Sequence, residues 1–155
     1  MSNTEETDVK NLIEKAFSDE ITDLLLKKSN LTRIQLETFI IDILSDILSS
    51  NRVSFHEKAQ FRNKKVSRGS FSRTLSQARS RVISSVMTII LLNYIGIFDN
   101  TIFDDFRSLA EKLRDYLNSS TNSKEKLSSI QFNRIENELI EGIITLSKPT
   151  SIKNM

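Results

Sequence analysis

The residues with the clearest capacity for chemistry lie in one short stretch, KKVSRGSFSRTLSQARSR, between Lys64 and Arg81. On a helical wheel, the apolar residues of this stretch and its continuation fall within one narrow arc: Phe71, Leu75, Ala78 and Val82. The other side carries small and hydrogen-bonding residues: Gly69, Arg73, Ser76, Gln77 and Ser80, flanked by Ser70 and Arg81. We therefore expect a helix that packs through one side and faces outward with the other.

The outward side has the composition of a surface that reads nucleic acid. Arg and Gln side chains hydrogen-bond bidentately to guanine and adenine edges, and small residues let a helix backbone lie close to a groove wall. This side carries no acidic residue, whereas the solvated face of an ordinary core helix usually mixes Lys with Glu. Ser67 is a good N-cap for a helix that begins at Arg68. The stretch is predicted to be a DNA-recognition helix.

The charge of the chain is concentrated around this stretch. From Arg52 to Arg81 there are nine basic residues and one acidic residue, Glu57, which gives a net charge of +8 in a chain of only +2. Concentrated positive charge is stronger evidence for nucleic-acid binding than net charge. The side chains predicted to contact DNA are Lys64, Lys65, Ser67, Arg68, Ser70, Arg73, Ser76, Gln77, Ser80 and Arg81.

The composition predicts a helical fold. The chain has 155 residues, of which 38% are hydrophobic, but only three Gly and one Pro, so we expect a single all-α domain over residues 1–155. The absence of Cys excludes disulfides, thiolate metal sites and cysteine nucleophiles. The first residues, MSNTEE, lack the pattern of a secretory signal, and a cytoplasmic location is expected.

Residues 4–30 are predicted to form an N-terminal helical arm. Apolar residues recur at three- and four-residue steps through Thr4 to Lys28, which indicates one amphipathic helix. Residues 1–51 carry ten acidic and five basic residues, so this part of the chain is poorly suited to phosphate contacts. Its expected role is a scaffold or a dimerisation arm.

Two capping boxes mark the next helices. Thr32 with Gln35 begins a helix that runs to Leu48, and Ser54 with Glu57 begins a short helix over 55–62. A medium helix, a short helix, a basic turn and a helix with outward Arg and Gln follow the order of a tri-helical helix-turn-helix unit.

Three segments, LTRIQLE (31–37), EKAQF (57–61) and VSRGSFSRTLSQAR (66–79), resemble the three helices of prokaryotic helix-turn-helix transcription regulators. They are most similar to units of the sigma factor region four kind, whose recognition segment often begins Val-Ser-Arg-Gly and closes Ala-Arg. The resemblance covers residues 31–81. It implies a tri-helical DNA-binding core and a role in transcription regulation with double-stranded DNA as the partner.

Residues 82–148 are predicted to be a helical packing and dimerisation region. The uncharged run from Val82 to Phe98 points apolar residues all round, which is typical of a core helix buried on every side, and Gly96 is its expected stop. This run is interrupted by polar residues, and we expect no membrane span. Further helices are predicted over 102–117 and 124–147, separated by a loop over 118–123.

Catalysis has little support in the sequence. His56 is the only imidazole, and the carboxylate pairs Asp104 with Asp105 and Glu136 with Glu138 do not share a helix face. We therefore expect no catalytic residues, no metal and no cofactor.

The excess of apolar surface outside residues 31–81 favours a homodimer, in which two recognition helices would meet a palindromic site. The alternative is a non-catalytic helical protein-interaction module or an RNA-binding protein with a basic patch.

Overall fold

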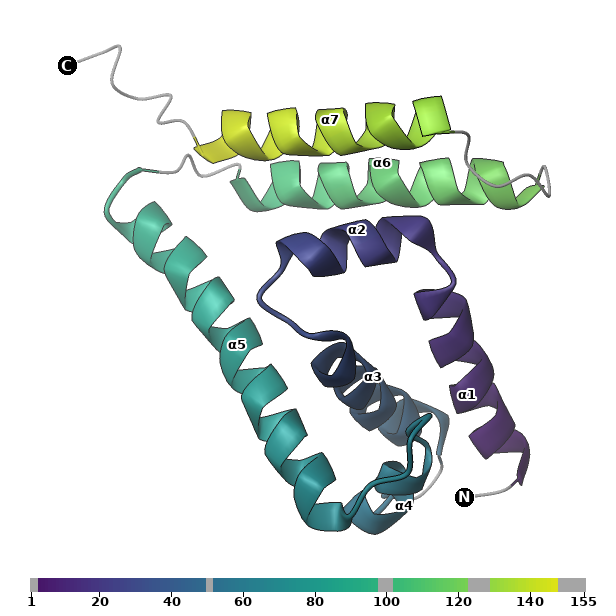
Figure 1. Ribbon diagram of the computed structural model, residues 1–155. Helices are drawn as coiled ribbons and strands as arrows, with labels where there is room; N and C mark the ends of the chain where they lie inside the picture. Colours follow the sequence, from purple (N-terminus) through teal and green to yellow (C-terminus); the bar gives the residue numbers. More distant parts are fainter. Residues whose placement is uncertain (1–2, 50–51, 98–101, 123–128, 148–155) are drawn as a thin grey trace. The chain divides into compact units, whose positions relative to one another are not determined.

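The computed structural model describes residues 3–49, 52–97, 102–122 and 129–147, and within them the chain is all-α, with no strand (Figure 1). The predicted all-α class is thus confirmed, and the tri-helical helix-turn-helix core stays a prediction. The chain divides into two compact units, Met1–Val86 and Met87–Met155. The expectation of one domain stays a prediction. The described helices are α1 (Asn3–Phe17), α2 (Glu20–Lys28), α3 (Arg33–Leu48), α4 (Phe55–Gln60), α5 (Arg68–Tyr94), α6 (Ile102–Asn122) and α7 (Ser129–Ser147).

The N-terminal arm is two helices, so the prediction of one helix from Thr4 to Lys28 is wrong. The break falls at Ser18 and Asp19. The Asp19 carboxylate accepts hydrogen bonds from the Ile21 backbone N–H at 2.9 Å and from the Thr22 hydroxyl at 2.8 Å. Asp is among the best N-cap residues, and this cap starts a second helix although the apolar spacing continues through it.

The two predicted capping boxes are confirmed. In α3 the Thr32 hydroxyl accepts from the Gln35 N–H, and the Gln35 side chain accepts from the Thr32 N–H. In α4 the same reciprocal arrangement joins Ser54 and Glu57. Each box satisfies backbone donors that the first turn of a helix leaves without a partner.

The first unit is built around one hydrophobic core. α1 packs on α3, and α4 lies against α3. Phe71 and Leu75 of α5 insert into the same core, and the Phe71 ring lies 6.2 Å from that of Phe55. The buried members of the cluster are Val9, Ile13, Ile41, Val53, Ala59, Phe61, Phe71 and Leu75. This core fixes the N-terminal half of α5 through one side of the helix.

α5 begins and ends as the sequence predicts. The Ser67 hydroxyl accepts from the Ser70 N–H at 3.2 Å. At the other end Gly96 has a φ of 77° and donates to the Asn93 carbonyl, while the Ile97 N–H reaches back to the Leu92 carbonyl. This pair of bonds is a Schellman motif, which favours Gly at the left-handed position.

The second half of α5 differs from the expectation. The prediction that the apolar residues beyond Val82 are buried on every side is wrong, because Ile83, Met87 and Leu91 each expose more than half of their surface. The side chains of this run are therefore exposed on more than one side of the helix.

α6 and α7 are neighbours in the second unit and run side by side in opposite directions (Figure 1). Tyr116 of α6 donates to Glu138 of α7 at 3.0 Å, and a Cβ added at Gly142 would lie 3.6 Å from the Leu109 side chain. α6 continues to Asn122, so the predicted loop over 118–123 is wrong up to that residue. No Gly or Pro interrupts 118–122, and residues such as Ser and Asn weaken a helix only slightly. The predicted helix start at Lys124 lies outside the described residues.

Candidate nucleic-acid interface

The predicted outward side of α5 is exposed. Phe71, Leu75 and Ala78 are buried, so the helix packs through the side that the wheel indicates. The side chains that face away from the core are exposed: Gly69, Arg73, Ser76, Gln77 and Ser80, together with Ser70 and Arg81. A Cβ added at Gly69 would meet no atom within 4 Å, so the backbone there is open to an approaching surface.

Basic side chains surround the N-terminal end of this surface. Lys64 and Lys65 lie in the turn before α5, and Arg68 is its first residue. Together with Arg73 they are exposed, and within the described part of the chain none of them has an acidic side chain within ion-pair distance. Their charge is therefore available to an external anion.

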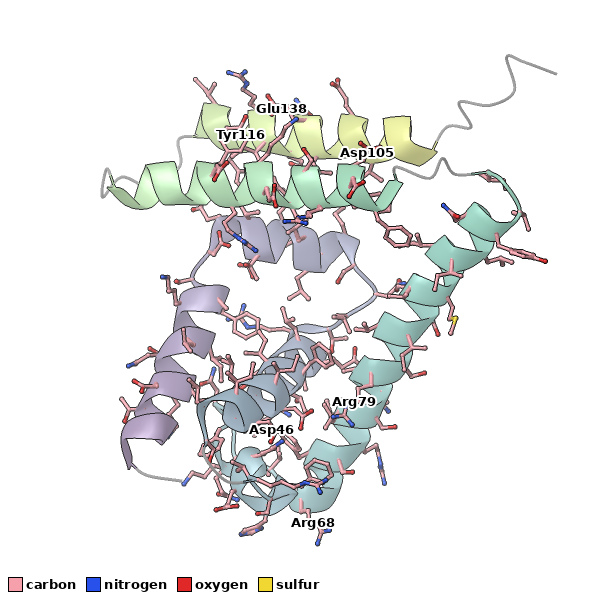
Figure 2. The ribbon with its side chains drawn as sticks, turned by 180° about the vertical axis from the view of Figure 1, so that it is seen from behind. Asp46, Arg68, Arg79, Asp105, Tyr116 and Glu138 are labelled. Atoms are coloured by element: carbon pink, nitrogen blue, oxygen red, sulfur yellow. The ribbon has the colours of Figure 1, made fainter. Side chains whose placement is uncertain are left out.

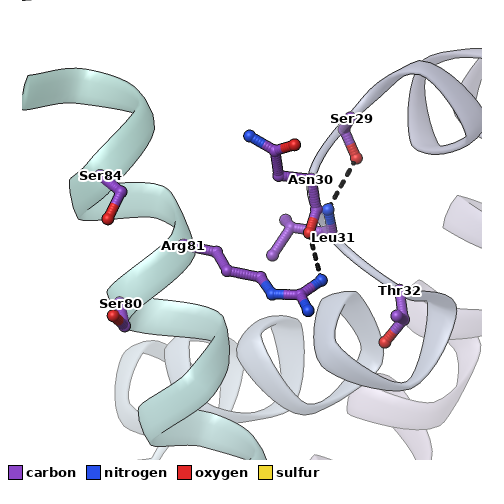
Figure 3. A pocket seen from close by; sticks show the side chains of 7 residues that line it. All are labelled: Ser29, Asn30, Leu31, Thr32, Ser80, Arg81 and Ser84. Carbon is purple, nitrogen blue, oxygen red and sulfur yellow. Dashed lines mark hydrogen bonds between the residues drawn. The ribbon is translucent and has the colours of Figure 1, made fainter. Parts of the chain in front are cut away.

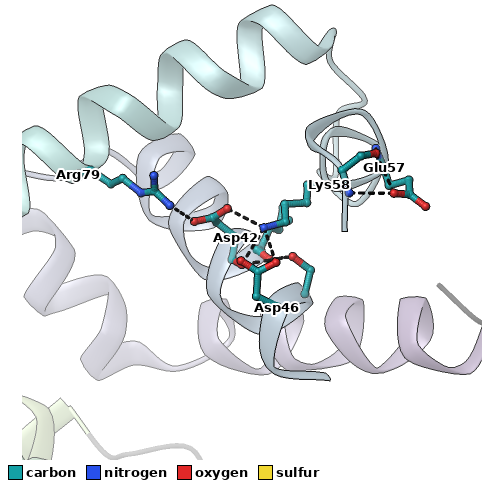
Figure 4. Close-up of polar contacts among 8 residues, drawn as sticks. Asp42, Asp46, Glu57, Lys58 and Arg79 are labelled. Atoms are coloured by element: carbon teal, nitrogen blue, oxygen red, sulfur yellow. Dashed lines mark hydrogen bonds and ion pairs between the residues drawn. The ribbon is translucent and has the colours of Figure 1, made fainter. Parts of the chain in front are cut away.

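Lys58 is a basic residue of a different kind. Its side chain is only 3% exposed, and its ammonium lies 2.8 Å from the Asp42 carboxylate and 2.7 Å from that of Asp46 (Figure 4). It also donates to the Asp42 backbone carbonyl. Because an isolated buried charge is strongly unfavourable, these α3 carboxylates are what allow Lys58 to be buried.

Arg79 and Arg62 also face acidic residues of α3. The Arg79 guanidinium lies 2.6 Å from the second oxygen of Asp42, so one carboxylate joins α3 to both α4 and α5 (Figure 4). Arg62 is buried with its Nε 3.3 Å from Glu37, whose other oxygen accepts from the Asn63 N–H. Arg62 Nε itself has no hydrogen-bond partner among the described residues, so its contact with Glu37 is an ion pair. Three of the nine basic side chains counted in the sequence are thus neutralised internally.

Arg81 differs from both groups of cations, because it has a hydrogen-bond partner but no acidic one among the described residues. It donates to the backbone carbonyl of Asn30 (Figure 3). The Asn30 side-chain amide in turn donates to the Ser85 hydroxyl at 3.5 Å. These bonds tie α5 to the segment between α2 and α3. A polar pocket of about 490 Å³ opens here, lined by Ser29, Asn30, Leu31, Thr32, Ser80, Arg81 and Ser84. Arg81 remains exposed, and its contact with a neutral carbonyl leaves its charge uncompensated.

A second hollow of about 430 Å³ lies beside the N-terminal end of α5 and is lined by Arg52, Val53, Ser54, Phe55, His56 and Arg68. Figure 2 shows Arg68 at this end of the helix, about three turns before Arg79. Arg52 and His56 are absent from the predicted contact residues. The available signal in the sequence was Arg52 followed by the apolar residues Val53 and Phe55 where α4 begins.

Glu57, the acidic residue closest in sequence to this hollow, takes part in the capping box of α4. Glu57 accepts from the hydroxyl of Ser54 at 2.7 Å and from its backbone N–H at 2.9 Å. These two hydrogen bonds hold the pKa of Glu57 below its ordinary value, in that order of importance. Glu57 therefore stays ionised at neutral pH and stabilises the start of α4.

Glu138, a member of one acidic pair noted in the sequence, is engaged by its neighbours on α6 and α7. Glu138 accepts from Arg134 and from Tyr116, and these hydrogen bonds lower its pKa and raise that of Tyr116. The hydrogen bond between Tyr116 and Glu138 links α6 to α7. In the part of the chain that the structure describes, no group of three or more His, Asp or Glu side chains is arranged to hold a metal. Among those same residues, no helix combines the length and apolar character needed to cross a membrane.

Comparisons with known proteins do not assign the chain to a family. It matches no protein-family model, and searches of curated proteins and of solved structures return no matching protein.

Proposed function

We propose that the chain is a DNA-binding transcriptional regulator in which residues 68–81 of α5 serve as the recognition helix. The single observation that supports this most is the exposed side of α5. It presents Arg73 and Gln77 among small residues, and it has no acid between Arg68 and Tyr94. A helix of this composition fits the major groove, where Arg and Gln discriminate bases through paired hydrogen bonds.

The basic residues around this helix would hold the phosphate backbone. Lys64, Lys65 and Arg68 precede and begin α5, where side chains of a helix lying in a groove meet the flanking strands. The core contacts of Phe71 and Leu75 and the Arg79–Asp42 ion pair hold α5 against α3. A rigidly held helix is what sequence readout requires, since contacts to bases depend on fixed geometry.

Selection of bound fragments from random duplex DNA tests this proposal. The full chain is expected to enrich one sequence, and its affinity for that sequence is expected to fall steeply with salt. Enrichment of single-stranded or structured RNA instead would favour the RNA-binding alternative. Binding to neither nucleic acid would contradict the proposal and favour a protein-interaction module.

The regulator is further proposed to act as a homodimer. The exposed apolar residues of α5 beyond Val82, among them Ile83, Met87 and Leu91, support an apolar association surface. A two-fold pair would place two recognition helices on a palindromic site. Light scattering at micromolar concentration tests this: twice the 17.8 kDa chain mass is expected, and a monomer bound to a single half-site would contradict it.

A further inference from the structure

The hollow beside the start of α5 combines two chemical features. Its floor is apolar, since Val53 belongs to the core cluster and Phe55 packs against that cluster. The Phe55 ring is half-buried and lies 6.2 Å from the buried ring of Phe71. The floor is therefore held in place by the same core that holds α5.

The sides of the hollow carry positive charge. Arg52 and Arg68 are exposed and have no acidic partner among the described residues, and His56 also lines the hollow. The closest carboxylate in sequence, Glu57, is bonded to Ser54 and accounts for one compensating negative charge. Two guanidinium groups and one carboxylate leave the hollow with a net attraction for an anion.

A ligand that fits must therefore present an anionic group and an apolar face within a short distance. The sugar–phosphate unit of a DNA strand has both, because its phosphate suits the guanidinium groups and its deoxyribose carbons suit the Phe55 ring. Arg68 belongs at once to this hollow and to the proposed recognition helix. A strand that borders the groove occupied by α5 would pass this point.

We infer that the Arg52, Phe55, His56 and Arg68 hollow is a seat for one backbone sugar–phosphate unit of the bound duplex. This inference rests on the proposed function. It extends the interface from α5 to the segment that begins α4. It also assigns to Arg52 a positioning contact that carries no sequence information, because phosphate contacts fix register and base contacts specify.

Arg52→Ala tests the seat in the full chain. Its affinity for the selected duplex is expected to fall with salt about one unit less steeply than that of the unmodified chain, while preference among sequences is unchanged. Interference by phosphate ethylation should lose one position at the edge of the site. Arg114→Ala is the matched control, because Arg114 is an exposed arginine on α6, and it should change neither result.

The outcomes separate the seat from the proposed function. An unaltered salt slope and ethylation pattern for Arg52→Ala, with Arg73→Ala still losing base preference, would overturn the seat and leave the recognition helix standing. An unmodified chain that binds no duplex would overturn both. Arg52→Lys should restore most of the slope, and failure of this rescue alongside a loss of helix content by circular dichroism would show that Arg52 serves only the fold.

Discussion

The two sides of the segment from Arg52 to Arg81 use the same residue types for different purposes. On the side facing α3, Lys58 and Arg62 are buried and Arg79 is paired, each with a carboxylate of that helix. On the outer side, residues such as Lys64 and Arg68 are exposed and have no acidic partner among the described residues. The inner cations hold helices together, and the outer cations remain for a partner.

This comparison changes how the local charge should be counted. Nine basic residues lie in the segment, and three of them are neutralised by Glu37, Asp42 and Asp46 of α3. The acidic character of residues 1–51 is thus partly the internal complement of the basic segment. The charge available to an interface is therefore the number of basic residues minus the number that are paired with carboxylates inside the protein.

The largest expected effect comes from breaking the inner group. Asp42→Asn removes the carboxylate shared by Lys58 and Arg79, and we expect a loss of about 3 kcal/mol in the free energy of unfolding, because a buried ammonium loses its buried partner. Asp46→Asn is the control, since Asp46 is half exposed and its loss should cost less than about 1 kcal/mol. Urea unfolding of both variants measures the difference. Equal losses would mean that Asp42 is not the centre of the network.

The next effect concerns base readout on the outer side. Arg73→Ala or Gln77→Ala should cost about 1–3 kcal/mol of binding free energy on the selected duplex and flatten preference at one base pair, because a bidentate contact is lost. Binding to a panel of single-base variants of the site measures this. A uniform weakening on every sequence would demote these residues to phosphate contacts.

A smaller effect, on the salt dependence of DNA binding, distinguishes the outer cations from the inner ones. Arg68→Ala should reduce the steepness of the salt dependence by about one unit, and Lys64→Ala or Lys65→Ala should do the same. Arg79→Ala is the matched arginine control, and it should leave the salt slope unchanged because its charge already faces Asp42. If Arg79→Ala lowers the slope as much as Arg68→Ala does, the division into inner and outer cations is wrong.

Features set by neighbouring residues were predictable from the sequence. The capping boxes at Thr32 and Ser54, the Ser67 cap and the Gly96 stop each depend on residues within one turn, and each is present in the structure. The exposed side of α5 also followed from helical periodicity alone. The break at Asp19 was missed because the apolar spacing continues across it, although its cap residue is a local signal.

Features that depend on distant residues were not predictable. Asp42 is 16 residues from Lys58 and 37 from Arg79, so no local sequence pattern predicts that these side chains form ion pairs. The net charge of +8 therefore overstates the free positive charge of the segment, because it includes Lys58, Arg62 and Arg79. The hollow containing Arg52 was missed for the same reason, because α4 and the start of α5 are adjacent only in the fold.

The most direct test of this division is the salt dependence of duplex binding by the full chain. Six of the nine cations have no acidic partner among the described residues: Arg52, Lys64, Lys65, Arg68, Arg73 and Arg81. If these six alone displace counterions, the slope of log affinity against log salt per chain should be no steeper than about −5.4, at roughly −0.9 for each phosphate neutralised. A slope near −8 would mean that the inner cations also reach DNA, and a slope near zero would contradict the interface itself.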